Sequence, residues 1–426
     1  MRETLDKLVH MIESCCSLKT DCDNDVLTWE KMRLQTLSYM NEFLGRVAFF
    51  YAEKDYIWAY DELSLGLYKI NLCKKEVELV LAPMQIHKEN IIRICGVVKK
   101  ESEIILVPES VNENWIVYNT TDKSIKYIYP LFAKHRISEV RQEDNMIYLI
   151  PLDTNEPIIL ISVEDMKPIK QIDNWYDVQN KITKKHLCMP SSSDGINVFF
   201  SVYETKCICM VNAKETRMFE INISNSVVSI SVWGEDIWIL PEKGNFIYRA
   251  DNKGNLLDCI ELAAEYGITA DQFARIVATG MYIFLFPYDG DTVCVYKKTD
   301  KMILKTDAAL KPLWGTFLVG NMYCSFWGYY ADSKILHLLP WGYRYIEIDL
   351  STLEICESKL NYGETYWQKD YVNWCLRAKS NYSKTFFRDN SKNSLEEFVQ
   401  FLDMKSDKKH YNNMTDIGKD IWKYSK

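Results

Sequence analysis

Carboxylate side chains follow a series of short apolar segments, just after each segment ends. They are Asp61, Glu62, Glu109, Asp153, Glu204, Glu242, Asp289 and Asp291. Two carboxylates on opposite sides of a sugar can act as the acid and the base or nucleophile of glycoside hydrolysis, and a ring of acids can attract a cation or a cationic partner. The simpler interpretation is that each strand ends and a solvated acid follows in the turn. No two of these acids have a spacing that identifies a catalytic pair.

Aromatic residues occupy equivalent places beside these acids, namely Tyr60, Tyr203, Tyr288 and Trp341. An aromatic ring next to a carboxylate is a common sugar-binding arrangement, because the ring stacks on the sugar while the acid accepts hydroxyl hydrogen bonds. Packing between neighbouring sheets is the alternative use of such rings. Both interpretations require that the apolar segments form strands whose following loops lie close together in the fold.

The apolar segments are copies of one unit. Their last positions are, in chain order, Asp61, Pro108, Pro151, Phe200, Pro241, Pro287 and Pro340, at steps of 41 to 53 residues. Seven copies at this spacing predict a β-propeller with seven four-stranded blades. The fourth copy is the weakest because it lacks the proline and follows a long polar stretch, so six or eight blades remain alternatives.

Each copy ends in a second recurring feature, an apolar strand that turns sharply through polar residues. Examples are residues 118–124, 296–301 and 348–354. Such hairpins complete a four-stranded sheet, and stacking the sheets around an axis buries both faces of each one. The first and last copies each contain four strand-like segments, so the ring is expected to close by packing or through the extra segment 371–388.

Three regions follow from this pattern. Residues 1–44 and 391–426 show helical spacing of apolar residues and predict short helical extensions, whereas residues 45–390 form the propeller. The extensions could pack on the propeller or bind a partner.

Composition limits the possible partners and locations. The net charge of −8 gives no positive field for a phosphate backbone, so we expect no nucleic-acid partner. No apolar run is long enough to span a bilayer and no secretory leader is evident at the N-terminus.

The 13 cysteines are an odd number and scattered, as in a reducing compartment, which predicts a cytoplasmic protein. Cys95, Cys259, Cys294 and Cys324 lie in apolar runs and are expected to be core residues.

Metal and cofactor motifs are missing from the sequence. The six histidines are isolated, and the turn at 287–292 lacks the further acids and terminal Glu of a calcium loop. No nucleophile elbow, Walker loop or dinucleotide fingerprint is found. We therefore expect neither a metal nor a cofactor, and the oligomeric state is left open.

The repeated Ile-aromatic-Leu-x-Pro strand, hairpins such as Tyr68-Lys69-Ile70-Asn71-Leu72 and the closing Ser394-Leu395-Glu396-Glu397-Phe398 resemble a loose group of propeller proteins from low-GC Gram-positive bacteria. The resemblance covers residues 45–402. It implies a setting among genes for surface polysaccharide or glycan assembly, and it assigns no catalytic residue.

The sequence thus predicts a non-catalytic binding or scaffold propeller. It would recognise a protein partner or a glycan intermediate through an acidic, aromatic-rich face with Asp61, Glu62, Glu109, Asp153, Glu204, Glu242, Tyr288, Asp289 and Trp341 as binding candidates. A carbohydrate-active hydrolase or lyase that uses two carboxylates of that face is the alternative.

Overall fold

The chain divides into two compact units, Met1–Tyr371 and Val372–Lys426. A computed structural model describes parts of the first unit, namely residues 47–53, 55–61, 66–82, 85–86, 92–110, 113–129, 136–176, 188, 190–262, 268–287, 293–306, 326–340 and 344–359. The helical extensions predicted for 1–44 and 391–426 lie outside these residues, as does the segment 371–388.

The described residues form seven antiparallel four-stranded sheets, each built from four consecutive strands. Blade 1 contains β1 (Val47–Ala52), β2 (Tyr56–Asp61), β3 (Gly66–Asn71) and β4 (Glu76–Leu81). Blade 2 contains β5 (Ile94–Lys100), β6 (Glu103–Pro108), β7 (Trp115–Asn119) and β8 (Ile125–Ile128). Blade 3 contains β9 (Ile137–Glu143), β10 (Met146–Pro151), β11 (Ile158–Ser162) and β12 (Pro168–Ile172). Blade 4 contains β13 (Ser192–Ser193), β14 (Val198–Ser201), β15 (Cys207–Val211) and β16 (Thr216–Glu220).

The remaining three blades repeat this arrangement. Blade 5 contains β17 (Val227–Trp233), β18 (Asp236–Pro241), β19 (Phe246–Asp251) and β20 (Leu256–Glu261). Blade 6 contains β21 (Phe273–Ala278), β22 (Tyr282–Pro287), β23 (Val293–Lys297) and β24 (Met302–Thr306), preceded by the 3-10 turn η3 (Ala270–Gln272). Blade 7 contains β25 (Phe326–Ala331), β26 (Ile335–Pro340), β27 (Arg344–Asp349) and β28 (Ile355–Lys359). The prediction of a seven-bladed all-β propeller is confirmed.

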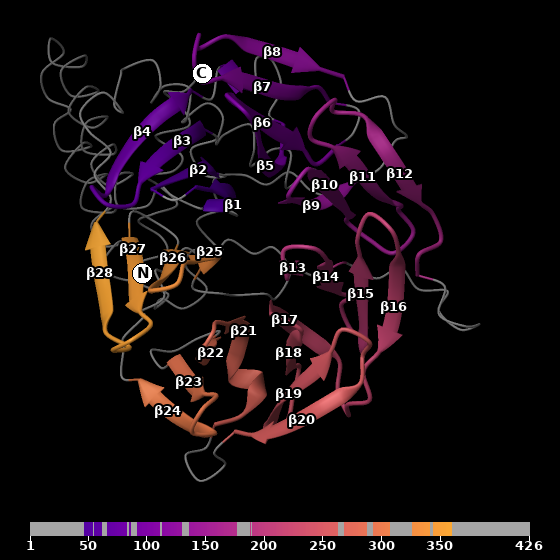
Figure 1. Ribbon diagram of the computed structural model, residues 1–426, viewed down its shortest axis with the longest axis vertical. Coiled ribbons are helices and arrows are strands. Elements are labelled where there is room, and N and C mark those ends of the chain that lie inside the picture. The colour runs from indigo at the N-terminus through magenta and orange to yellow at the C-terminus, as the bar shows by residue number, and fades with distance from the viewer. Residues whose placement is uncertain are drawn as a thin grey trace, which may run out of the picture. The chain divides into compact units, whose positions relative to one another are not determined.

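Within this unit the first strand of each blade lies toward the centre of the ring and the fourth lies at its outside (Figure 1). Hydrophobic clusters fill the spaces between successive blades from blade 2 to blade 7. Burial of one aliphatic side chain stabilises a fold by about 1.5–3 kcal/mol. The core therefore lies between the sheets, which explains why the second and third strands are apolar on both faces.

The end of each second strand is the position that the sequence repeat identified. Pro108, Pro151, Pro241, Pro287 and Pro340 are the last residues of their strands, and Asp61 takes this place in blade 1. Proline has no N–H to donate, so a sheet ladder tends to end there. In all six blades the pairing skips one residue of the first strand at this point, which is a β-bulge.

Blade 4 departs from this pattern, as its weak sequence signal suggested. Phe200 lies one residue before the end of β14, and β13 contains only two residues. An isolated bridge between Cys188 and Val202 takes the place of the upper part of the first strand. The described pairing of β13 with β14 therefore lacks the bulge of the other blades.

Five of the seven hairpins between third and fourth strands begin with an Asn or Asp whose side chain accepts main-chain hydrogen bonds. In blade 7, Asp349 Oδ1 accepts from the N–H of Ser351 at 2.7 Å and of Thr352 at 2.9 Å. A later residue takes the left-handed conformation, such as Leu353 with φ of 62°. Hydrogen bonds to the carboxylate, chiefly from the Ser351 side chain, lower the pKa of Asp349 to about 2. The predicted hairpins at 118–124, 296–301 and 348–354 are confirmed.

The ring closes by packing, because blades 1 and 7 each have four strands of their own. Strand β1 contacts β25, and Lys75 of blade 1 pairs with Glu347 of blade 7 at 2.5 Å. The Lys75 ammonium lies 4.2 Å from the ring centroid of the buried Tyr345.

The Tyr345 hydroxyl shares a hydrogen bond with His337 Nδ1. Burial lowers the pKa of His337, although the carboxylates of Asp332 and Glu347 oppose this shift.

The expected burial of the cysteines is correct for Cys95 and Cys294 and wrong for Cys259, which is exposed. Cys259 lies on β20, the outermost strand of blade 5, where solvent replaces a neighbouring strand. Cys324 lies outside the described residues.

Candidate functional site

The propeller has two faces that are built from different connections. We call the face formed by the loops between second and third strands, together with the connections between blades, the loop face. The opposite face contains the hairpins between first and second strands and between third and fourth strands, and we call it the hairpin face. The carboxylates predicted as binding residues follow the second strands and therefore belong to the loop face.

Glu109 is buried on the loop face between two arginines that precede neighbouring first strands. Its carboxylate accepts hydrogen bonds from Arg136, with Nε at 3.1 Å, and forms an ion pair with Arg93 at 2.9 Å. The main chain joins the same elements, because Glu109 N–H donates to Arg93 O and Ile137 N–H donates to Glu109 O. Burial and the Glu109 charge raise the pKa of the neighbouring Glu113. Glu109 therefore connects blades 2 and 3.

The other described acids of the loop face have local roles or face solvent. Asp153 is 1% exposed, and its carboxylate accepts a hydrogen bond from Asn155 N–H at 3.0 Å. Glu242 is exposed and accepts a hydrogen bond from the Ser226 hydroxyl at 2.5 Å. Glu204 is exposed and has a left-handed φ of 59°.

The side chains of the remaining predicted residues lie outside the described part of the chain. Asp61 ends β2, but only its backbone is described. Glu62, Tyr288, Asp289 and Trp341 lie outside the described residues. The four acids that are described each belong to a different blade, from blade 2 to blade 5.

A set of polar residues that sequence reasoning missed holds the first strands of neighbouring blades together. Gln142 of β9 accepts a hydrogen bond from Lys99 N–H of β5 and donates one to Lys99 O, both at 2.8 Å. Ser192 Oγ of β13 accepts from Val232 N–H of β17 at 2.8 Å. A first strand has a free edge, and an unsatisfied main-chain N–H there would be unfavourable. These side chains satisfy that edge.

The same device continues from blade 3 to blade 4 and from blade 5 to blade 6. Glu139 of β9 accepts two hydrogen bonds from Ser191, from its N–H at 2.6 Å and from its hydroxyl at 2.9 Å. Ser231 Oγ of β17 accepts from Ala278 N–H at 2.8 Å. The sequence signal for these contacts is a polar residue at alternate positions of an apolar inner strand, as in β17.

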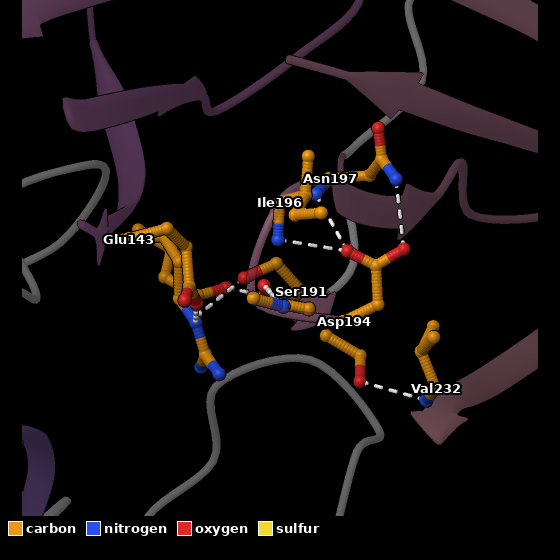
Figure 2. Close-up of polar contacts among 11 residues, drawn as sticks. Glu143, Ser191, Asp194, Ile196, Asn197 and Val232 are labelled. Atoms are coloured by element: carbon orange, nitrogen blue, oxygen red, sulfur yellow. Dashed lines mark hydrogen bonds and ion pairs between the residues drawn. The ribbon is translucent and has the colours of Figure 1, made fainter. Parts of the chain in front are cut away.

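Figure 2 shows where blades 3, 4 and 5 meet. Asp194 holds its own turn, because Oδ1 accepts from the N–H of Ile196 at 2.9 Å and of Asn197 at 2.6 Å. Arg141 donates from Nε to Glu143 at 2.9 Å. Burial lowers the pKa of Arg141, but the carboxylates of Glu143 and Glu139 raise it above its ordinary value. These contacts fix the positions of the hairpin tips at this point.

Three large apolar side chains are exposed on the tips of the hairpins between first and second strands in blades 4, 5 and 6. Ile196 is 70% exposed in blade 4, Trp233 is 41% exposed in blade 5, and Met281 is 46% exposed in blade 6. We call these three residues the hairpin arc. The Trp233 ring lies against the next tip, since a Cβ built on Gly280 would be 3.6 Å from its Cζ2 atom. The described tip residues of the other four blades are polar: Glu53, Asp55, Glu101, Ser102, Asp144, Asn145, Asp332, Ser333 and Lys334.

Exposed apolar residues that cluster on one face are typical of interaction sites. Scattered exposed apolar residues are normal, but the arc lies on the first hairpins of three consecutive blades, with Ile196 and Met281 in the turns and Trp233 at the end of β17. Its position at the end of the first strands puts it toward the centre of the hairpin face (Figure 1). This arrangement is suited to recognition, because its rigid tips present an aromatic and two aliphatic side chains to solvent.

No metal site accompanies the arc. Among the residues that the structure describes, no group of three His, Cys, Asp or Glu side chains could hold a metal ion. Within the same residues there is no helix with the length and apolar character needed to span a bilayer.

Matches to known proteins were found only among solved structures. No family model and no curated protein matches the chain. Among solved structures, PorZ, a surface component of the type-IX secretion system of Porphyromonas gingivalis, matches with 10% identity and a TM-score of 0.47. The extracellular domain of a protein assigned as a one-component system from B. thetaiotaomicron matches with 12% identity and a TM-score of 0.46.

These matches are partial. They cover 76% and 74% of this chain but 39% and 38% of the solved chains, so this chain spans well under half the length of either. The resemblance to propeller proteins of Gram-positive bacteria and the cytoplasmic location stay predictions.

Proposed function

We propose that this propeller is a binding module that docks a protein partner on the hairpin arc. The observation that carries the proposal is the position of Ile196, Trp233 and Met281 at equivalent tips of three consecutive blades. An exposed aromatic residue beside aliphatic residues is the usual centre of a protein interface, and tryptophan is enriched among residues that dominate binding.

Rigid support strengthens the proposal. The tips that carry the arc are joined by the hydrogen bonds of Ser192 to Val232 and of Ser231 to Ala278. A surface that is already ordered loses little conformational entropy on binding. The proposed surface lies on the hairpin face, whereas the candidates predicted from the sequence follow the second strands and belong to the loop face.

The test compares two triple variants with equal numbers of exposed apolar residues removed. The arc variant carries Ile196→Ser, Trp233→Ser and Met281→Ser. The control carries Tyr129→Ser, Ile169→Ser and Phe246→Ser, which removes exposed side chains elsewhere. Both variants and the wild type are immobilised as full chains, proteins captured from a native lysate are identified, and each captured protein is purified and titrated against all three.

We expect a purified partner that binds the wild type and the control equally and binds the arc variant at least about tenfold more weakly, as for a dominant interface residue. Circular dichroism and thermal unfolding confirm that both variants fold. Equal binding of every captured partner to the folded arc variant and to the control would overturn the proposal. A complete absence of partners for the wild type would do the same.

A further inference from the structure

The hairpin arc is bordered by acids that have no cationic partner among the described residues. Asp144 in the tip of blade 3 and Glu235 in the tip of blade 5 are exposed. Asp194 in the tip of blade 4 accepts hydrogen bonds only from neutral donors, the N–H groups of Ile196 and Asn197 and the Asn197 amide. By contrast, Glu143 is neutralised by Arg141.

In the tips of blades 4 and 5 an acid lies two residues from the exposed apolar side chain. Asp194 lies two residues before Ile196, and Glu235 lies two residues after Trp233. Asp144 extends the negative charge to blade 3, whereas at the tip of blade 6 Lys298 Nζ donates to Thr279 O. The Ser191 N–H that donates to Glu139 and the Val232 N–H that donates to Ser192 connect blades 3, 4 and 5 beside these tips (Figure 2).

We propose that the hairpin arc takes an extended segment of a partner protein in which apolar side chains are flanked by lysine or arginine residues. This inference rests on the proposed function and adds the chemistry of the partner. Apolar side chains of the segment would pack on Ile196, Trp233 and Met281, and its cationic groups would pair with Asp144, Asp194 and Glu235. Complementary charge increases both selectivity and the rate of encounter.

Charge complementarity selects this occupant over others. A second copy of the arc would place like charges opposite one another, which is unfavourable. An acidic segment would meet the same repulsion, and the net charge of −8 of the whole chain adds to it at long range. A wholly apolar segment would leave the acids of the rim partly desolvated without a partner.

The experiment selects peptides without assuming a partner sequence. A library of random peptides of about 12 residues, long enough to span several interface contacts, is displayed on phage and selected on immobilised full-length wild type. Binders to the arc variant Ile196→Ser, Trp233→Ser, Met281→Ser are removed in each round. We expect the selected peptides to be enriched in lysine or arginine together with leucine, isoleucine, phenylalanine or tryptophan.

Selected peptides are then titrated against charge variants of the protein. Asp144→Asn together with Glu235→Gln removes two charges of the rim, and Glu204→Gln is the matched control on the loop face, where that acid is also exposed. Each rim charge is expected to contribute about twofold to fivefold in affinity at low salt, as for exposed ion pairs. The loss should shrink at high salt because exposed charges are screened.

Selection of acidic or uncharged peptides, or of none that depends on the arc, would overturn the inference. Unchanged binding of basic peptides to the Asp144→Asn, Glu235→Gln variant would overturn it as well. The proposed function is tested separately, because a natural partner that requires the arc but whose bound segment lacks lysine and arginine contradicts only the inference.

Discussion

Carboxylates have different environments on the two faces of the propeller. On the loop face, Glu109 is buried between two arginines and Asp153 is buried within its turn. On the hairpin face, Asp144 and Glu235 are exposed and flank exposed apolar side chains. Glu109 and Asp153 hold loops in place, whereas Asp144 and Glu235 remain available to a partner. The comparison teaches that a carboxylate in a propeller loop cannot be assigned to recognition before its burial is known.

The comparison predicts that removal of a loop-face acid lowers stability most. Glu109→Ala leaves Arg93 and Arg136 without their shared carboxylate. Loss of a buried partner typically costs 3–5 kcal/mol, but these arginine side chains are 40% and 60% exposed, so we expect about 2–3 kcal/mol. Urea unfolding measures the change, with Glu235→Ala at an exposed acid of the hairpin face as a control that should lie within about 0.5 kcal/mol of wild type. Equal midpoints for the two variants would show that Glu109 does not stabilise the blade 2 to blade 3 connection.

A smaller effect is expected for an acid of the hairpin face. Asp194→Ala removes the acceptor of the Ile196 and Asn197 N–H groups, but both donors lie near solvent and can bond to water. We expect a loss of about 1 kcal/mol, similar to that of other turn and cap acceptors. Amide hydrogen exchange at Ile196 and Asn197 should accelerate as the tip loosens. Asp194→Asn is the matched control, since it keeps a side-chain oxygen, and exchange as fast in this variant as in the alanine variant would argue against the turn contact.

The smallest expected effect is a pH dependence on the hairpin face. Lys298 lies near Trp238 and donates to Thr279 O at 2.6 Å. Burial lowers its pKa to about 8, with Asp236 opposing the shift and Arg249 adding to it. Between about pH 8 and 10.5 the unfolded chain would hold the extra proton, so stability should rise with pH in this window. After allowance for solvent screening the rise should stay below about 1 kcal/mol.

Lys298→Met should remove this rise in a series of unfolding measurements from pH 7.5 to 10. Lys297 is the matched control, because its hydrogen bond with Asp300 raises its pKa instead. A pH profile of Lys298→Met that parallels the wild type would contradict the assignment of the lowered pKa to Lys298.

The sequence predicted the fold in detail because the same pattern of apolar segments and polar turns recurs in each blade. The apolar runs that end at Pro108, Pro151, Pro241, Pro287 and Pro340 are the second strands, and proline marks their ends for a local reason. The polar turns are also local, since Asp349 needs only the residues that follow it. The two-residue strand β13 appeared as the copy without a proline.

The site was less accessible to sequence reasoning because its properties arise between blades. Glu109 looked like an exposed acid after a proline, yet it meets Arg93 and Arg136, which stand in two different connections. Ile196 looked like the first residue of the fourth apolar segment, but it is exposed in a turn, and its significance depends on Trp233 and Met281 in the next two blades. Cys259 looked like a core residue and is exposed because its strand is the outermost one.

By itself the sequence determined the strand pattern and the turn chemistry and favoured seven blades over six or eight, since these depend on contacts within about 50 residues and on the conformational limits of proline and of turn residues. Tertiary structure alone decided which acids are buried and which apolar side chains remain exposed together on the hairpin face. It also decided that Gln142 joins β9 to β5 and that Ser231 joins β17 to β21. Those properties depend on which strand faces which neighbour after the ring has closed, and burial and electrostatic pairing follow from that arrangement.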